Sequence, residues 1–153
     1  MVDLILRIQN EEAGIGLSLQ EQPDLLDISA SYSQSGGEFW IALEEERVIG
    51  TIGLLRLDER CAALKKFFVD AQYRTQGVGR SLYQELLRFA HSRQLRFLIL
   101  DTPAVATASH RFYERAGSRP VTRTQLPTAF SYPDRDSRLY LLELSQSGGI
   151  RPR

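Results

Sequence analysis

Hydrophobic and polar residues alternate at the start of the chain. Over residues 3–9, Leu4, Leu6 and Ile8 would lie on one face of an extended backbone, which predicts a half-buried strand. Pro23 is typical of a helix start, and we expect a short helix to follow it. The hydrophobic residues of that helix would be Leu25, Leu26 and Ile28.

Three hydrophobic runs rich in aromatic and β-branched residues come next. They span residues 38–43, 48–57 and 62–69, and short charged segments separate them. Connections as short as these join neighbouring strands in antiparallel order. The pattern therefore predicts an antiparallel meander of three strands.

The spacing of the hydrophobic residues becomes helical after the third run. Val78, Leu82 and Leu86 are four residues apart, which predicts an amphipathic helix that ends near Arg93. Residues 96–100 form a nearly continuous hydrophobic run, as a strand buried on both faces would. A strand, a helix and a further strand in this order predict a right-handed crossover.

The remainder of the chain completes the fold. We expect a second helix over residues 103–114, with Gly117 as its C-terminal cap. Several prolines in residues 119–138 predict a loop or a distorted strand, and residues 138–144 predict the final strand. The fold class is α+β, a mixed sheet with an antiparallel N-terminal half and helices on both faces.

The length and composition fit one domain with a full hydrophobic core. The chain has 153 residues, of which 42% are hydrophobic and 25% are charged. We assign residues 1–144 to this domain. Residues 145–153 contain two glycines and a proline, and we expect them to be disordered.

Charge, cysteine content and hydropathy argue against several classes of partner. Nineteen basic residues balance nineteen acidic ones, so no general field attracts nucleic acid or anionic lipid. Cys61 is the only cysteine, and neither His91 nor His110 has a second ligand at metal spacing, so we expect no metal site. The sequence shows no membrane-spanning run and no signal peptide, which predicts a cytoplasmic protein.

A glycine-bearing turn separates the third strand from the following helix. The first N–H groups of a helix have no partner within it and carry the positive end of its macrodipole, so they bind anions well. Glycines let a ligand approach the backbone closely. The turn, which therefore predicts a phosphate site, reads Arg74-Thr75-Gln76-Gly77-Val78-Gly79-Arg80.

Three phosphate-binding motifs compete for this turn. A P-loop needs four residues between its glycines, but only Val78 separates Gly77 from Gly79. The dinucleotide motif G-x-G-x-x-G lacks its third glycine, because Leu82 stands there, although Asp101 follows at a suitable distance. That motif also belongs to the first strand–helix turn of a domain, so a dinucleotide-binding domain stays a remote alternative.

The third motif extends over much of the chain. Residues 74–79 match R/Q-x-x-G-x-G/A, and the chain here resembles the GNAT superfamily of N-acetyltransferases. Residues 112–117 are similar to the tyrosine-bearing helix end of that family, and residues 64–69 and 98–102 are similar to the strands around its motif helix. The resemblance covers residues 38–121 and implies a GNAT-like fold.

The resemblance also implies an activity. A GNAT enzyme moves the acetyl group of acetyl-CoA by direct transfer to a primary amine of a small molecule, or to a protein or peptide amine. The loop amides would hold the diphosphate of acetyl-CoA, and the strand before the loop would pair with its pantetheine arm. The residues that this assigns to acetyl-CoA are Phe67, Phe68, Val69, Arg74, Thr75, Gln76, Gly77, Val78, Gly79 and Arg80.

The reaction requires a proton donor for the leaving sulfur and a base that removes a proton from the amine. Tyr113 corresponds to the family's tyrosine near the coenzyme A sulfur, and its phenol would serve as donor to that sulfur. Several relatives use a glutamate on the central strand as the base for the amine, but residues 62–64 contain no carboxylate here. Glu38 and Asp101 are the candidate substitutes, and a water chain is an alternative.

The helix that carries the tyrosine departs from the family in one further place. Ala106 stands where many relatives have an asparagine, and Ser109, one turn before Tyr113, is the candidate that could contact the cofactor instead. His110 lies on the same helix, and we expect it to be exposed.

The acceptor is not identified by the sequence. Candidate acceptor contacts are the aromatic and acidic residues Tyr32, Phe39, Trp40, Phe130, Tyr132, Asp134 and Asp136. A rival hypothesis is a non-catalytic acyl-CoA-binding sensor or interaction module, which the missing glutamate favours and Tyr113 opposes. A homodimer would be common for a domain of this size, although no interface signature is present.

Overall fold

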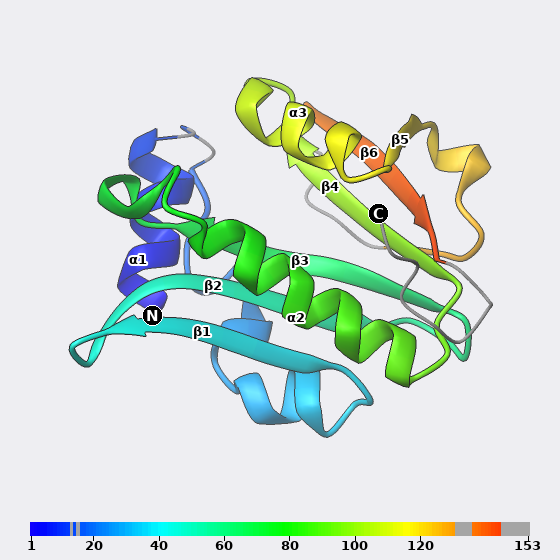
Figure 1. Cartoon of the computed structure of the whole chain (residues 1–153), viewed down its shortest axis with the longest axis horizontal. Coiled ribbons are helices and arrows are strands. Elements are labelled where there is room, and N and C mark those ends of the chain that lie inside the picture. Colours follow the sequence, from blue (N-terminus) through cyan, green and yellow to red (C-terminus); the bar gives the residue numbers. More distant parts are fainter. Residues whose placement is uncertain (13, 15, 131–135, 145–153) are drawn as a thin grey trace.

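The computed structural model describes residues 1–12, 14, 16–130 and 136–144, and within them six strands form one mixed sheet (Figure 1). The order across the sheet is β1-β2-β3-β4-β6-β5. The strands are β1 (Glu38–Glu44), β2 (Arg47–Arg56), β3 (Cys61–Val69), β4 (Phe97–Pro103), β5 (Arg119–Val121) and β6 (Ser137–Glu143). The predicted meander is confirmed, because β1, β2 and β3 pair antiparallel and β4 lies parallel to β3. The tail 145–153 lies outside the described residues.

Helices cover both faces of the sheet. α2 (Val78–Ser92) crosses β1, β2 and β3 on one face, and α3 (Thr107–Arg115) lies along β4 and β6 (Figure 1). The opposite face of β2 and β3 is covered by the N-terminal segment, by which we mean the described residues among 1–37. That segment contains α1 (Val2–Arg7), the π-helical turns η1 (Ile8–Glu12) and η3 (Ser29–Ser33), and the 3-10 turn η2 (Pro23–Leu25). Two further 3-10 turns are η4 (Ala71–Tyr73) and η5 (Arg123–Gln125).

The predicted first strand is wrong, because residues 2–7 form a helix. Leu4, Ile5 and Ile8 are buried, and positions i, i+1 and i+4 share one face of a helix. The alternation of Leu4, Leu6 and Ile8 also fits a strand, so the hydrophobic spacing alone was ambiguous. Packing of α1 against β2 and β3 favours the helix.

Two other helices are shorter than the sequence predicted. α3 begins at Thr107 rather than at residue 103, because Pro103 is the last residue of β4 and pairs with Ser137. The helix predicted after Pro23 is a single 3-10 turn in which Leu25 is buried, whereas the following Leu26 is 65% exposed.

A β-bulge at Lys66 redirects the side chains in the second half of β3. Lys66 has a φ of +52°, a left-handed conformation that few non-glycine residues adopt, and the register with β2 shifts at this point. The buried Thr51 hydroxyl donates to the Lys66 carbonyl at 2.7 Å. Because of the extra residue, Phe67 and Val69 pack toward α2 in place of Lys66.

β3 and β4 separate after three residue pairs. Parallel pairing joins residues 61–63 to residues 97–99 and goes no further. On their outer edges, β3 stays paired with β2 and β4 stays paired with β6. Within the residues that the structure describes, the facing edges of residues 64–69 and 100–103 therefore have backbone groups without a strand partner, and the two strands diverge in Figure 1. We call this gap the strand opening.

Asp70 anchors the end of β3. Its side chain is 5% exposed, and its carboxylate lies 3.1 Å from a guanidinium nitrogen of Arg7 and of Arg47. It also accepts the backbone N–H of Gln72 at 3.0 Å. This backbone hydrogen bond and the two arginines hold the pKa of Asp70 below its usual range. One carboxylate thus joins α1, β2 and the segment that leads to the glycine turn.

We expect Asp70→Ala to lower the free energy of unfolding by about 2 kcal/mol, through a lost N-terminal cap and two half-exposed ion pairs. A carboxyl whose folded-state pKa is lowered stabilises the protein above its ordinary pKa and loses its effect as the pH falls through the lowered value. Urea unfolding at pH 7 and below about pH 3 measures this. An equal difference between wild type and variant at both pH values would contradict the anchoring by charge.

Candidate active site

The turn before α2 directs backbone N–H groups toward one point. Thr75 and Gly77 have φ values of +67° and +87°, so the chain turns left-handed on both sides of Gln76. The first hydrogen bond of α2 runs from the Ser81 N–H to the Gly77 carbonyl at 3.0 Å. The N–H groups of residues 78–80 consequently have no acceptor within the helix. These amides stand at the positive end of α2, as an anion site requires.

Arg74 lies at the edge of this turn. Its Nε donates to the Val69 carbonyl at 2.9 Å, and its guanidinium lies 2.6 Å from the carboxylate of Glu12. Both side chains of this ion pair are partly exposed. An anion bound in the turn would compete with Glu12 for the guanidinium, because phosphates form strong hydrogen bonds with arginine.

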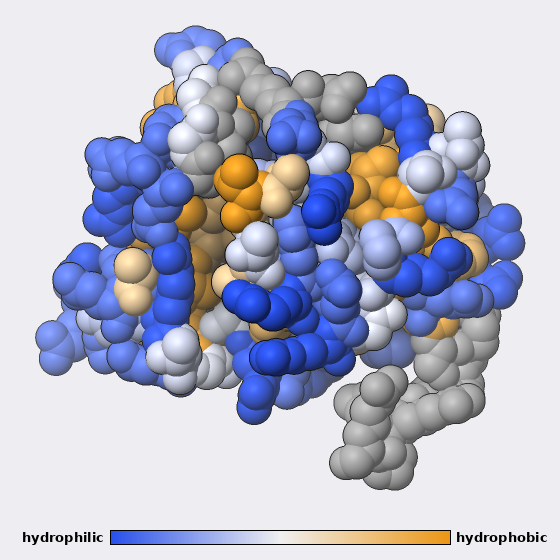
Figure 2. Space-filling view, turned by 90° about the horizontal axis from the view of Figure 1, so that it is seen from above, coloured by the Kyte–Doolittle hydropathy of each residue, from blue (hydrophilic) through white to orange (hydrophobic). Residues whose placement is uncertain are grey.

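Phe67 connects the turn to α3 across the strand opening. A Cβ on Gly79 would lie 3.6 Å from the Phe67 ring, so the start of α2 packs closely against this side chain. The Phe67 ring centroid is 6.3 Å from that of Tyr113 and 5.6 Å from that of Phe112. Figure 2 looks down on this side of the molecule and shows a hollow with hydrophobic walls between polar surfaces. The turn and Tyr113 therefore lie on either side of one aromatic residue of β3.

The C-terminal end of α3 holds Tyr113 in place. Gly117 has a φ of +99°, and its N–H donates to the Glu114 carbonyl at 3.1 Å. The next N–H, that of Ser118, donates to the Tyr113 carbonyl at 2.9 Å. This pair of bonds is a Schellman motif, and the predicted glycine cap is confirmed.

The Tyr113 phenol is kept neutral by its surroundings. The residue is 6% exposed. Burial raises the pKa of the phenol above its usual range, and the nearby Tyr83 and Asp101 raise it further because they would disfavour a second negative charge. Tyr113 is therefore a hydroxyl donor at neutral and at moderately alkaline pH.

Asp101 lies on β4 at the strand opening. Within the described residues, its partly buried carboxylate makes no hydrogen bond and no ion pair with another side chain. Burial raises the pKa of this carboxyl, and the positive charges of Lys65 and Lys66 offset part of the rise. A carboxylate with a raised pKa is a better proton acceptor than an ordinary one.

Glu38 and Ser109 occupy different places. Glu38 begins β1, two strands or about 10 Å from β3. Its carboxylate accepts from the Ser33 hydroxyl at 2.7 Å and from the Phe39 N–H at 3.0 Å. The structure does not bring Glu38 together with Asp101. Ser109 is half-buried on α3, the helix beside the strand opening.

His110 is buried, so the expectation of an exposed residue is wrong. It lies on the inner face of α3, where its Nε2 is 2.9 Å from the Pro103 carbonyl. A carbonyl only accepts, so Nε2 carries the proton in this pair. The His110 ring is tilted against the Tyr140 ring, with centroids 5.9 Å apart, and helps to join α3 to the sheet.

Lys66 and Tyr83 also lie near the strand opening, although neither was predicted as a site residue. Lys66 is the bulge residue, and its burial was invisible in a strand pattern that appeared regular. Tyr83 lies on the inner face of α2, where its ring stacks on Phe67 at 6.2 Å. Burial raises the pKa of the Tyr83 phenol to about 12. In the described part of the chain, neither its hydroxyl nor the nearby Ser118 hydroxyl has a hydrogen bond of normal geometry.

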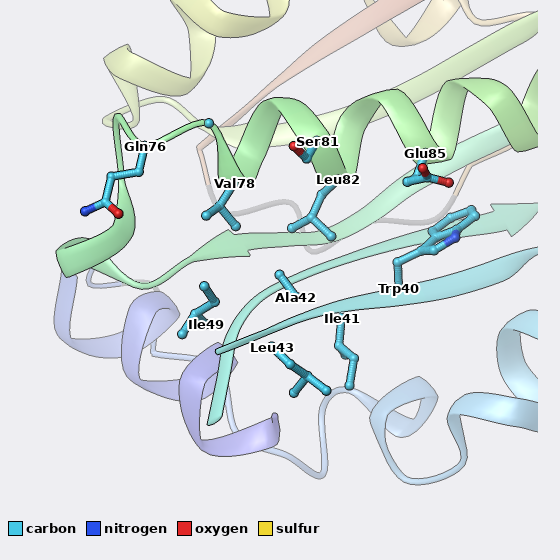
Figure 3. A pocket seen from close by; sticks show the side chains of 11 residues that line it. Trp40, Ile41, Ala42, Leu43, Ile49, Gln76, Val78, Ser81, Leu82 and Glu85 are labelled. Atoms are coloured by element: carbon cyan, nitrogen blue, oxygen red, sulfur yellow. The ribbon is translucent and has the colours of Figure 1, made fainter. Parts of the chain in front are cut away.

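A groove of about 360 Å³ lies between α2 and β1 (Figure 3). It borders the turn at Gln76, but it lies on the β1 side of α2, whereas Tyr113 and Asp101 lie toward β4. Trp40 lines this groove and packs on Phe89 at 5.6 Å. The groove is therefore separate from the strand opening.

The other predicted acceptor contacts are spread over the molecule. Tyr32 is buried, and its ring centroid lies 5.1 Å from that of Phe39. The centroid of the Phe130 ring lies 4.7 Å from the Lys65 ammonium nitrogen. Asp136 is described, and its carbonyl accepts the Ala104 N–H at 2.9 Å. Tyr132 and Asp134 lie outside the described residues.

The described part of the chain contains neither a cluster of metal-ligating side chains nor a membrane-spanning helix. Among the residues that the structure describes, no group of three or more His, Cys, Asp or Glu side chains is placed to hold a metal ion. No helix in the same part of the chain is long and hydrophobic enough to cross a membrane.

The parts of this site define a class of protein. A parallel strand pair that opens beside an anion-binding helix start accommodates an extended, phosphate-bearing cosubstrate between its strands. A profile of the acetyltransferase (GNAT) family matches residues 3–117 of the chain. The chain belongs to this family.

Individual relatives, among them solved structures, support this family assignment. A Streptococcus agalactiae acetyltransferase is 43% identical, with a TM-score of 0.90 over 94% of this chain and 88% of its own. Human N-acetyltransferase 8 is 35% identical over 100 residues, and Danio rerio N-acetylaspartate synthetase is 32% identical over 104 residues. These matches cover 61% and 67% of this chain but only 44% and 37% of those relatives, so the chain spans less than half their length.

One structure with the same fold contains the cosubstrate. A GNAT family acetyltransferase from Elizabethkingia anophelis, with acetyl-CoA bound, has a TM-score of 0.59 at 20% identity. At this identity the likeness concerns the fold alone. The meander before the glycine turn and the family match exclude the dinucleotide-binding alternative.

Proposed function

We propose that this protein transfers the acetyl group of acetyl-CoA directly to the primary amine of a small molecule. The observation that carries the proposal is the strand opening, which ends at the N–H groups of the glycine turn and has Tyr113 on its other side. Membership of the acetyltransferase family supports it. The name of one relative describes the synthesis of N-acetylaspartate, a small molecule, which supports an acceptor of this size.

The residues of the turn and of β3 would bind acetyl-CoA. The amides of residues 75–80 would hold the diphosphate, with Arg74 as a charged donor. The edge of residues 67–69, which pairs with no strand in the described part of the chain, would pair with the pantetheine amides as a neighbouring strand does. Ser109 would contact the cofactor from α3. Together these contacts would bring the thioester close to Tyr113.

Asp101 would act on the amine. A neutral amine must attack the thioester carbonyl, so an acceptor that arrives as an ammonium has to lose a proton. Asp101 lies at the strand opening with a carboxylate that no side chain in the described residues occupies. Glu38 lies two strands from β3, so of the two candidate carboxylates Asp101 is the one that we propose as the base.

Tyr113 would stabilise the leaving thiolate by a hydrogen bond. A thiol has a pKa near 8.5, below the ordinary pKa of about 10 for tyrosine. Because burial raises the pKa of Tyr113 further, its proton stays on the phenol while the thiolate accepts a hydrogen bond from it. The nitrogen–carbon bond forms as the carbon–sulfur bond breaks. Asp101 takes the proton that the ammonium loses before the attack and passes it to solvent. The second proton, which the nitrogen loses as the amide forms, also goes to Asp101, and the thiolate takes its proton later from solvent.

The direct test follows the release of free coenzyme A thiol from acetyl-CoA with a panel of small primary amines, and identifies the N-acetyl product by mass spectrometry. Transfer to an amine supports the proposal. Acetyl-CoA binding in a calorimeter without transfer to any amine would favour the non-catalytic acyl-CoA-binding module. No binding at all would contradict both functions.

Gln76→Glu should weaken acetyl-CoA binding about tenfold or more, because it adds a negative charge at the turn that would hold the diphosphate. Gln76 is exposed, and an acidic residue before a helix does not destabilise it, so the fold should persist. Calorimetric titration with acetyl-CoA measures the dissociation constant. The matched control is Gln76→Ala, which should stay within about threefold of wild type. Equal affinities of the two variants would argue against a diphosphate at this turn.

A further inference from the structure

The only two lysines of the chain are neighbours on the strand opening. Lys65 and Lys66 lie on β3 just past the point where it leaves β4, and every other basic residue of the chain is an arginine. The bulge places the Lys66 side chain against the N-terminal segment, on the face of the sheet away from α2. Phe67, by contrast, packs toward α2. The opening thus has a hydrophobic face and a charged face.

Lys66 is a largely buried cation with unused hydrogen-bonding capacity. Its side chain is 13% exposed, and its Nζ donates to the Gln22 side-chain oxygen at 2.6 Å. The nearest carboxylate oxygen, from Asp24, is 3.7 Å away, which is close enough for an ion pair but too far for a hydrogen bond. An ammonium has three N–H donors. Within the described residues, two of them have no acceptor.

The partners of Lys66 are themselves held in place. Gln22 and Gln9 exchange two side-chain amide hydrogen bonds of 2.9 Å each, and both residues are buried. Asp24 accepts a hydrogen bond of 2.5 Å from the Tyr32 hydroxyl. A cation fixed by such a network loses little freedom when it binds a ligand, so the arrangement is preorganised for an anion.

A negative group lies on the other strand of the opening. Leu98 and Leu100 of β4 belong to the core shared with α2, so the alternation of β4 directs Asp101 to the face of the lysines. The positive charges of Lys65 and Lys66 also offset part of the rise in the pKa of the Asp101 carboxyl, which is consistent with this placement. The charged face therefore presents cations from β3 and an anion from β4.

We infer that the acceptor is an amino acid or a similar molecule in which a carboxylate lies close to the amine. Lys66, beside Lys65, holds the carboxylate, and Asp101 receives the ammonium and then its proton. The inference rests on the proposed acetyl transfer, because that transfer places the acceptor amine at Asp101. Such an acceptor supplies one anion and one cation to a site that offers the opposite charges.

A purely structural role for Lys66 makes different demands. In that case Lys66 only fastens the bulge of β3 to Gln22 and Asp24 of the N-terminal segment. Its loss would then lower stability and the rate with all amines alike. A carboxylate-binding role instead affects acceptors with a carboxylate and leaves those without one nearly unchanged.

The first experiment compares matched acceptors with the wild-type protein. The probes are the proteinogenic L-α-amino acids and their α-carboxamides, which differ in the charge of one group. Thiol release from acetyl-CoA gives kcat/KM, and mass spectrometry identifies the N-acetyl product. When kcat/KM is expressed per neutral amine, because the two amines differ in pKa, we expect the preferred acid to exceed its carboxamide at least tenfold, since a charge-assisted hydrogen bond is lost with the carboxamide.

Variants of Lys66 locate the effect. Lys66→Met keeps the length of the side chain and should lower kcat/KM for the acid about tenfold to a hundredfold, mainly through KM, while the carboxamide changes less than about threefold. Lys66→Arg keeps the charge and should restore much of the loss. Arg88→Met removes an exposed cation on α2 and is the control that should change neither.

A second readout needs no turnover. Reductive methylation with ¹³C-formaldehyde labels only the two lysines and the N-terminal amine, and Lys66→Arg assigns the Lys66 resonance. Addition of the preferred amino acid should shift that resonance, whereas its carboxamide should not. This measurement remains available if Lys66→Met fails to fold.

The outcomes separate the two ideas. If carboxamides and simple amines are acetylated as well as acids, or if Lys66→Met lowers all rates equally, acetyl transfer stands and the carboxylate site is overturned. If acetyl-CoA binds but no amine of any kind is acetylated, the proposed transfer fails and this inference fails with it. A preference for acids that Lys66→Met abolishes and Lys66→Arg restores supports both.

Discussion

Tyr113→Phe is expected to lower kcat about a hundredfold while the dissociation constant of acetyl-CoA changes less than about twofold. The variant removes one hydrogen-bond donor from the leaving thiolate, and the loss of one such donor typically costs this much. The ring remains, so its packing against Phe67 and Tyr140 persists. Steady-state kinetics with the best acceptor and calorimetry with acetyl-CoA give the two quantities.

A neighbouring tyrosine offers a matched control. Tyr140 is buried beside Tyr113, with ring centroids 6.0 Å apart, but its hydroxyl donates to Glu114 at 2.8 Å, away from the strand opening. Tyr140→Phe should lower the free energy of unfolding by about 1 kcal/mol and leave kcat within about twofold. Equal losses of kcat and of acetyl-CoA affinity in Tyr113→Phe would refute the donor role.

Asp101→Asn is expected to abolish most of the activity and to stabilise the protein at the same time. The amide cannot accept the amine proton, so kcat/KM should fall about a hundredfold or more. In wild type, kcat/KM should rise with pH through the raised pKa of Asp101 when the acceptor's own titration is accounted for. The variant should lack that rise. A pH profile of both proteins measures this difference.

The raised pKa of Asp101 predicts that Asp101→Asn stabilises the protein at neutral pH. Because burial raises the folded-state pKa of Asp101, the fold favours its protonated form. The stabilising contribution is therefore full below the ordinary pKa of the carboxyl and is lost as the pH rises through the raised value. Asparagine is neutral throughout, so Asp101→Asn should unfold at a higher temperature than wild type at pH 7.

An exposed carboxylate provides the comparison for Asp101. Glu59 lies in the turn between β2 and β3, far along the strands from the glycine turn, and is exposed. Glu59→Gln should change neither the activity nor the melting temperature. If Asp101→Asn retains most of its activity, a water chain or another group removes the proton, and Asp101 is not the base.

The features that depend on neighbouring residues were predictable. The amphipathic spacing of α2 and the glycines before it are properties of a short stretch, and so is the cap at Gly117 that ends α3. The meander of β1, β2 and β3 followed from runs joined by short turns. Each of these predictions is confirmed, because local backbone geometry limits the alternatives strongly.

The features that depend on distant residues were not predictable. The bulge at Lys66 is a left-handed residue inside a strand, and its carbonyl is held by Thr51 of another strand. The burial of His110 depends on how α3 meets β4. The segment 2–7 fits either a strand or a helix until its contacts with β2 and β3 are known.

The sequence alone determined the family, the order of most elements, and the positions of the glycine turn and of the helix end that carries Tyr113, because these follow from local spacing and from a contiguous motif. Only the tertiary structure decided that Asp101 and Lys66 share one face of the strand opening and that Glu38 lies two strands from β3. The physical reason is that a side chain's face depends on strand register. A single bulge reverses that face without altering the composition of the strand.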